Sequence, residues 1–173
     1  MIKSEDLKDI IEKAIEEFNT KHKYLLENDL SERCICSAFA RCIENRIPKT
    51  TEYNGVVVDV EYNRGATGCE RAIKRINDEI IIPDLIVHKR GYDNHYGFFN
   101  LICVEMKKST DRRGSDSDRI RLRKLVGYDY GFIYRCGFMI IADMKDHLLK
   151  IESERFCRLE ASLSLWKKQK MNL

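Results

Sequence analysis

IIIPDLIVH at residues 80–88 and NLICVEMKK at residues 100–108 decide the fold of this chain. Each stretch is apolar and has the length of a buried β-strand. Asp84 lies within the first stretch, whereas Glu105 and Lys107 lie near the end of the second, on one face of it because side chains alternate along a strand. A buried, unpaired carboxylate is costly. If the two strands are neighbours, Asp84 and Glu105 converge, and they indicate a function rather than packing.

Helices and further strands surround these two segments. The apolar period predicts a helix at residues 5–18 and a second helix that begins after Ser31, an N-cap residue, and ends near Arg46, before Pro48. The other expected elements are a strand at 56–62, a short helix around 71–76, a hairpin loop at 91–97, a polar loop at 109–118, a basic helix ending near Gly127, a strand at 132–142 and a final helix at 146–168. This order predicts a mixed central β-sheet flanked by helices, in the α/β class.

The composition indicates one soluble domain that covers residues 1–173. Hydrophobic residues make up 43% and charged residues 34% of the chain, and the formal net charge is +3. The sequence contains no apolar run long enough for a membrane span, and its first residues lack the apolar centre of a secretory signal. The 7 cysteines lie mostly within apolar patterns, which favours a reducing, cytoplasmic location over disulfides.

The acidic residues and the lysine suit a divalent metal beside a phosphodiester. Carboxylate oxygens of Asp84 and Glu105 are the hard ligands that Mg²⁺ prefers, with Mn²⁺ as a substitute, and the Met106 carbonyl can add another. Such a metal polarises the phosphate and lowers the pKa of a bound water. Lys107 then orients or deprotonates the attacking water, or neutralises charge on the phosphate. Glu61 can extend the acidic cluster, pair with Arg64, or face solvent.

A local excess of basic residues adjoins this expected site. Between residues 107 and 124 there are eight Lys and Arg against three acidic residues. Such a stretch can follow a phosphate backbone, although a solvated helix face has the same composition. The residues expected to contact nucleic acid are Lys108, Arg112, Arg113, Arg119, Arg121, Arg123, Lys124, Arg64 and His88. His88 is alternatively structural.

The pattern Pro83-Asp84 … Glu105-x-Lys107 resembles the PD-(D/E)xK phosphodiesterase superfamily, over about residues 30–142. The resemblance implies the restriction-endonuclease-like core, with the order helix, three strands, helix, strand. It also implies that Glu32, on the helix before the first strand, joins the metal site. A glutamate in the first turn of a helix is alternatively explained by the helix dipole. Small bacterial and phage members carry similar segments, which implies a role in DNA processing or defence.

These observations predict a metal-dependent nuclease that hydrolyses phosphodiester bonds, with DNA favoured over RNA as the substrate. Asp84 and Glu105 are expected to hold the metal, Glu32 to assist, and Lys107 to serve hydrolysis. No recognisable segment encodes sequence specificity, so a homodimer, a separate partner or the shape of the DNA is expected to supply it. The alternative is a catalytically inactive nucleic-acid-binding or regulatory protein, because the superfamily includes such members. A purely structural domain would leave the buried carboxylates without a purpose.

Overall fold

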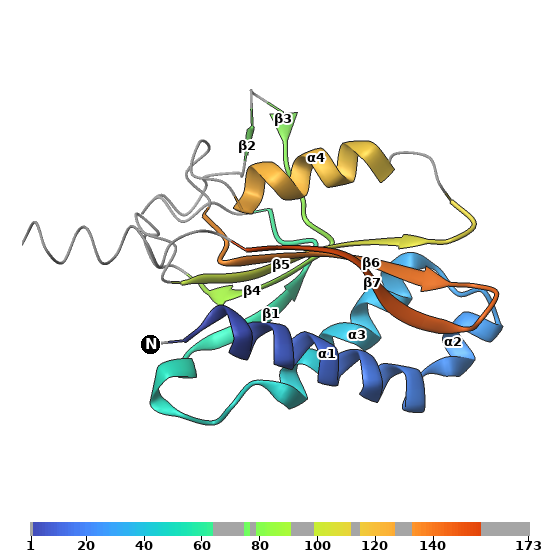
Figure 1. Cartoon of the computed structure of the whole chain (residues 1–173), viewed down its shortest axis with the longest axis horizontal. Helices are drawn as coiled ribbons and strands as arrows, with labels where there is room; N and C mark the ends of the chain where they lie inside the picture. Colours follow the sequence, from blue (N-terminus) through green and yellow to red (C-terminus); the bar gives the residue numbers. More distant parts are fainter. Residues whose placement is uncertain are drawn as a thin grey trace, which may run out of the picture.

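A five-stranded mixed sheet forms the centre of the structure (Figure 1). The computed structural model describes residues 2–63, 75–76, 79–90, 99–111, 115–126 and 133–156. The strands of the sheet are β1 (Val56–Val60), β4 (Leu85–Lys89), β5 (Asn100–Lys108), β6 (Cys136–Asp143) and β7 (Leu148–Phe156). They lie in the order β1-β4-β5-β6-β7, and only the β5–β6 pair is parallel. A parallel neighbour requires a crossover connection, and a helix lies in this one.

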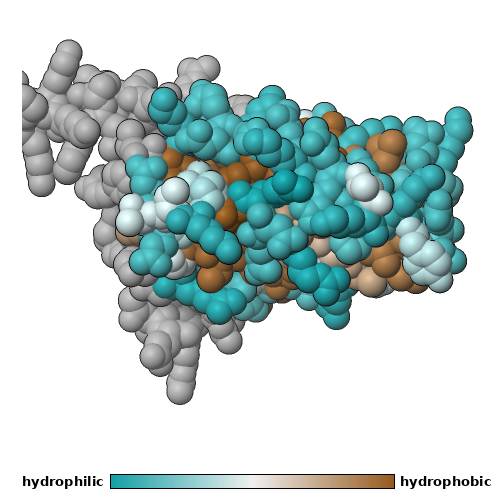
Figure 2. All heavy atoms as spheres, turned by 90° about the horizontal axis from the view of Figure 1, so that it is seen from below, coloured by the Kyte–Doolittle hydropathy of each residue, from teal (hydrophilic) through white to brown (hydrophobic). Residues whose placement is uncertain are grey.

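Helices cover both faces of the sheet, as the sequence predicts for the α/β class (Figure 1). The helices on one face are α1 (Ser4–Lys21), α2 (Lys23–Glu27) and α3 (Glu32–Arg46), and α4 (Ser115–Val126) lies on the other face. The 3₁₀ helix η1 (Thr51–Tyr53) follows α3, and β2 (Arg75–Ile76) pairs with β3 (Glu79–Ile80) apart from the sheet. The outer surface over α1, α2 and α3 is mostly hydrophilic, with smaller hydrophobic areas between the polar side chains (Figure 2).

Side-chain alternation divides the interior into two apolar cores. On the side of α1 and α3, Leu85, Val87 and Val104 pack with residues such as Phe18 and Phe39. On the side of α4, the smaller core is Ile81, Ile86, Cys103, Leu122, Leu125, Val126, Ile133, Tyr134 and Met139. Glu105 and Lys107 follow Cys103 at two-residue steps on β5, so they belong to the face that α4 covers.

Gly137 brings α4 close to the sheet. A Cβ atom at this position in β6 would lie 2.6 Å from Cγ2 of Val126 and 3.0 Å from Cδ1 of Leu122, both on α4. Gly137 is paired with Cys103 on β5, two residues before Glu105. The missing side chain therefore sets the height at which α4 lies above the carboxylate of Glu105.

We predict that Gly137→Ala lowers the free energy of unfolding by about 1–3 kcal/mol, because the added methyl group overpacks the contact with α4. Val126→Ala in the same chain removes the nearest clashing atom. The double variant should then lose less stability than the sum of the two single changes, as measured by urea denaturation. Strictly additive losses would show that α4 does not rest on Gly137.

The expected helix at 146–168 is wrong in its described part. Residues 148–156 form β7, which pairs antiparallel with β6 through a turn in which the Asp143 carboxylate accepts hydrogen bonds from the backbone N–H groups of Lys145 and Asp146. Leu149 is buried and Ile151 is partly buried, whereas Lys150 and Glu152 are exposed. This alternation is the two-residue period of a strand. Residues 157–168 lie outside the described part of the chain.

Three other elements differ from the expectation. The strand expected at 80–88 is interrupted, because β3 ends at Ile80 and β4 begins at Leu85, with Pro83 between them. Proline has no N–H to donate to a sheet. Arg75 and Ile76 are in β2 rather than in a short helix, and the loop expected at 109–118 ends earlier because α4 begins at Ser115. The expected hairpin loop at 91–97 lies outside the described residues.

Candidate acidic active site

Asp84 and Glu105 face each other across neighbouring strands. Leu85 of β4 is opposite Val104 of β5, so one further step along this register places Asp84 opposite Glu105. An Asp84 carboxylate oxygen accepts a hydrogen bond of 2.7 Å from the backbone N–H of Met106. Burial raises the pKa of Asp84, while the Met106 N–H and the charge of Lys107 oppose that rise. The convergence that the sequence predicts is therefore present in the fold.

Glu105 is buried and is held by an arginine from α4. Its side chain has an exposed fraction of 0%, and Nε and Nη2 of Arg121 donate hydrogen bonds of 2.6 and 2.7 Å to its two oxygens. Burial raises the pKa of Glu105 to about 8, and the guanidinium of Arg121 works against that rise. Glu105 in turn raises the pKa of Arg121, which is fully charged. Both oxygens of Glu105 thus carry a cationic partner.

Lys107 lies between two carboxylates from different helices. Its Nζ atom is 3.6 Å from Oε1 of Glu32 on α3 and 3.3 Å from Oδ2 of Asp118 on α4. Burial lowers the pKa of Lys107, but the charges of Glu32 and Asp118 outweigh this effect and the pKa is raised. Asp118 is buried, its Oδ1 accepts a hydrogen bond of 2.7 Å from Arg121, and its Oδ2 makes no hydrogen bond of good geometry. Asp118 therefore links the two cations of the site.

The site carries more acidic than basic groups. Its four carboxyl groups are those of Glu32, Asp84, Glu105 and Asp118, and its two cations are Lys107 and Arg121. With every group ionised, two negative charges remain. Burial raises the pKa of Glu32, as it does for Asp84 and Glu105. The site therefore favours the uptake of positive charge, either as protons or as a divalent cation.

Of the other expected ligands and contacts, Glu61 and His88 pair with residues outside this cluster, whereas Met106 reaches it through its backbone N–H. Glu61 accepts hydrogen bonds of 2.9 and 2.7 Å from the guanidinium of Arg33, the partner arginine that the sequence did not identify. The buried His88 has its Nε2 2.9 Å from a carboxylate oxygen of Asp59. Met106 contributes its N–H to Asp84, and its buried side chain lies against Cys36.

The basic residues expected to contact nucleic acid differ in their surroundings. Lys108 is paired with Asp29, and Arg119 is paired with Asp116 and Glu152. Arg121 lies inside the site rather than on a surface for a phosphate backbone. Arg123 is exposed and Lys124 is partly buried on α4. Arg64, Arg112 and Arg113 lie outside the described residues.

Sequence reasoning missed the structural roles of Asp118 and Arg121. The sequence pattern places Asp118 at the end of a polar loop, and it assigns Arg121 to nucleic-acid contact rather than to Glu105. A signal was present, because Leu122 and Leu125 lie four and seven residues after Asp118. This is helical spacing, so an acidic residue shares the apolar face of α4. A carboxylate on a buried face requires a cation as its partner.

The donor chemistry fits a hard divalent cation, although the ligands are few. Among the described residues, no group of three or more His, Cys, Asp or Glu side chains is arranged to hold a metal. Mg²⁺ commonly uses only one or two carboxylates and completes its shell with water and phosphate oxygens. Asp84 and Glu105 supply two carboxylates, and the buried Oδ2 of Asp118 lacks a good hydrogen bond. Arg121 stands against metal binding at Glu105, because its guanidinium already donates hydrogen bonds to both oxygens of that carboxylate.

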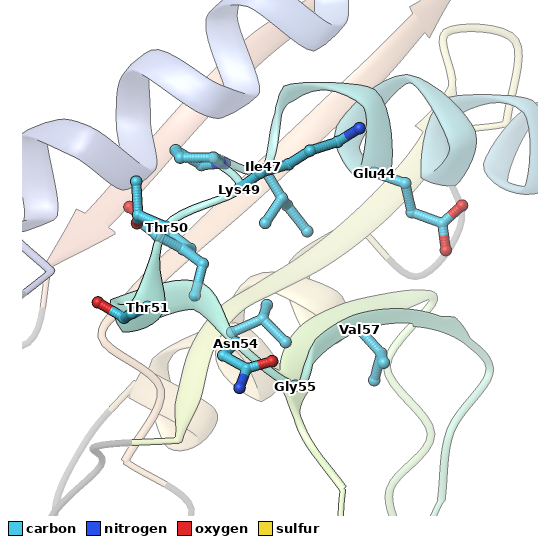
Figure 3. Close-up of a pocket in the computed structure, with 11 residues that line it drawn as sticks. Glu44, Ile47, Lys49, Thr50, Thr51, Asn54, Gly55 and Val57 are labelled. Carbon is cyan, nitrogen blue, oxygen red and sulfur yellow. The ribbon is translucent and has the colours of Figure 1, made fainter.

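A separate cavity of about 550 Å³ lies away from this cluster, between the end of α3 and the start of β1 (Figure 3). Glu44, Lys49 and Asn54 are among its lining residues, and none of the expected site residues lines it. None of the helices in the described part of the chain combines the length and apolarity needed to span a bilayer.

Comparisons of the chain with protein-family models, with curated proteins and with solved structures find no match.

We predict that Glu105 makes stability fall as the pH rises. Folding raises the pKa of this carboxyl group from 4.5 to about 8, so the folded chain binds the proton more tightly than the unfolded chain does. The stabilisation is complete below pH 4.5 and is lost as the pH rises through 8. The slope contributed by one such proton is at most about 1.4 kcal/mol per pH unit.

Urea denaturation of wild type and Glu105→Gln at several pH values, without metal, measures this effect. The variant cannot ionise at this position, so its stability should fall less steeply between these pH values. Glu44→Gln, which changes an exposed glutamate on α3, should keep the wild-type slope. Parallel profiles for wild type and Glu105→Gln would contradict the proton assignment.

Proposed function

We propose that this protein is a metal-dependent nuclease that hydrolyses phosphodiester bonds, with DNA as the favoured substrate. The observation that carries the proposal is the placement of Asp84 opposite Glu105, with Lys107 two residues further along the same strand. Two carboxylates that face each other and an adjacent ammonium group are the side chains needed to hold a metal and to stabilise a phosphate. The excess of negative charge in the site agrees with this role.

The sequence resemblance to the PD-(D/E)xK superfamily, which includes these same residues, is in line with the proposal. The order α3, β1, β4, β5, α4, β6 agrees with the helix, three strands, helix, strand order implied by the resemblance. Glu32, at the start of α3, lies beside Lys107 and is the proposed third acidic member of the site. The restriction-endonuclease-like core is therefore the proposed finer description of this α/β fold.

Asp84, Glu105 and Lys107 have distinct proposed roles in phosphodiester hydrolysis. Bound Mg²⁺, held by Asp84 and Glu105, would polarise the scissile phosphate and supply a water of lowered pKa. Glu32 and Asp118 raise the pKa of Lys107, so the lysine stays protonated near neutral pH. A protonated lysine cannot accept a proton from water. Lys107 therefore orients the attacking water by donating a hydrogen bond, or neutralises charge that develops on the phosphate.

Contacts to the substrate backbone would come from basic residues of α4. Arg123 and Lys124 lie on α4, the helix that also carries Asp118 and Arg121. Such contacts make affinity fall as the salt concentration rises. DNA, with a homodimer or a specificity partner, is the proposed binding partner, and the cytoplasm is the proposed location.

A cleavage assay on supercoiled, linear, single-stranded and branched DNA, and on RNA, tests the proposed activity. Wild type should cut at least one substrate in Mg²⁺ or Mn²⁺. Asp84→Asn removes a proposed metal ligand and Lys107→Ala removes the cation beside the phosphate, and each should lower the rate by about 10²-fold or more. Asp9→Asn, an exposed change on α1, should cut at the wild-type rate.

Absence of cutting by wild type on every substrate would contradict the nuclease proposal. Metal-dependent cutting that survives both Asp84→Asn and Lys107→Ala would place the activity elsewhere in the chain or in a contaminant.

One observation favours a second function, that of a catalytically inactive nucleic-acid-binding or regulatory protein. Both oxygens of Glu105 are bound by Arg121, so the carboxylate is neutralised without a metal. A protein that binds nucleic acid without cutting it does not require this ion pair to break. Salt-sensitive DNA binding that is unchanged by Mg²⁺ and by Asp84→Asn, together with no cutting, would favour this alternative.

A further inference from the structure

The guanidinium of Arg121 occupies the carboxylate that a metal would need. It donates to both oxygens of Glu105, at 2.6 and 2.7 Å, and also to Asp118 at 2.7 Å. The exposed fraction of the Glu105 side chain is 0%, so solvent does not supply an alternative partner. A metal ion bound to Glu105 would compete with the bidentate guanidinium of Arg121 for the same oxygen lone pairs.

We propose that Arg121 is an internal placeholder cation, which must leave Glu105 before a divalent metal binds there. This inference rests on the proposed metal-dependent function and adds a regulation of the same site. When Glu105 is ionised and no metal is bound, the ion pair compensates this buried carboxylate, because an unpaired charge at that position would destabilise the fold. Metal binding and the Arg121–Glu105 pair are therefore mutually exclusive.

The side chain of Arg121 lies where it can move away from Glu105 toward solvent. Its exposed fraction is 27%, in contrast to the fully buried Glu105, so the guanidinium lies at the boundary between the cluster and solvent. A phosphodiester is an anion that an arginine can bind through two parallel hydrogen bonds. A backbone phosphate at this boundary would attract the released guanidinium. Substrate and metal then favour each other's binding, because both stabilise the state in which Arg121 has left Glu105.

Mn²⁺ binding measured by electron paramagnetic resonance, without DNA, tests the placeholder. Arg121→Met cannot pair with Glu105 and should bind Mn²⁺ about tenfold or more tightly than wild type, because no ion pair has to break. Arg121→Gln keeps one hydrogen-bond donor for Glu105 and should show a smaller gain. It serves as the second variant if Arg121→Met does not fold, and circular dichroism establishes the folded state of each.

A matched control separates the ion pair from general charge. Arg119→Met removes the same charge from the same helix, but Arg119 pairs with Asp116 and Glu152 rather than with Glu105. Its Mn²⁺ affinity should stay within about twofold of wild type. A gain equal to that of Arg121→Met would overturn the placeholder, since removal of any α4 charge would then suffice.

The remaining outcomes distinguish this inference from the proposed function. Equal Mn²⁺ affinity in wild type and both Arg121 variants, with binding abolished by Glu105→Gln, would overturn the placeholder and leave the metal site in place. Mn²⁺ binding by none of the folded proteins, together with no metal-dependent cutting by wild type, would overturn both the placeholder and the nuclease. A tenfold gain in Arg121→Met that Glu105→Gln removes would support both.

Discussion

The buried carboxylate of Glu105 is the constraint on which the site depends. It lies in the middle layer of the molecule, on the β5 face that α4 covers, and water does not reach it. A charge there requires a cation at close range. Arg121 supplies that cation from α4, which Gly137 allows to lie close to the sheet. The close packing of α4 on the sheet therefore places the cation that Glu105 requires.

Lys107 and Asp118 extend this arrangement to the helix layer on the other face of the sheet. Lys107 reaches both Asp118 of α4 and Glu32 of α3, so side chains from both helix layers meet at the end of β5. Acidic groups outnumber basic ones in this cluster, and three of its carboxyl groups have raised pKa values. We propose that a cluster in this state exchanges protons or the Arg121 cation for a metal ion.

Local signals predicted much of the fold, and long-range pairing explains the errors. Ser31 caps α3, and the apolar run at residues 100–108 forms β5, because helix caps and uninterrupted apolar runs act locally. β7 was mistaken for a helix, since its apolar residues are few and its strand form depends on pairing with β6. The sequence predicts that Asp84 and Glu105 converge, because each lies in an apolar segment and the two segments are expected to be neighbouring strands. The Arg121–Glu105 pair was not predictable, because a charge count does not say which residues neutralise one another.

Anomalous diffraction from crystals soaked at saturating Mn²⁺ tests the central claim most directly, namely that Asp84 and Glu105 form a metal site that Arg121 fills in the metal's absence. The account predicts an anomalous peak in contact with both carboxylates, with the guanidinium of Arg121 displaced from Glu105. Crystals with no peak at this position and with the Arg121–Glu105 ion pair intact would contradict it.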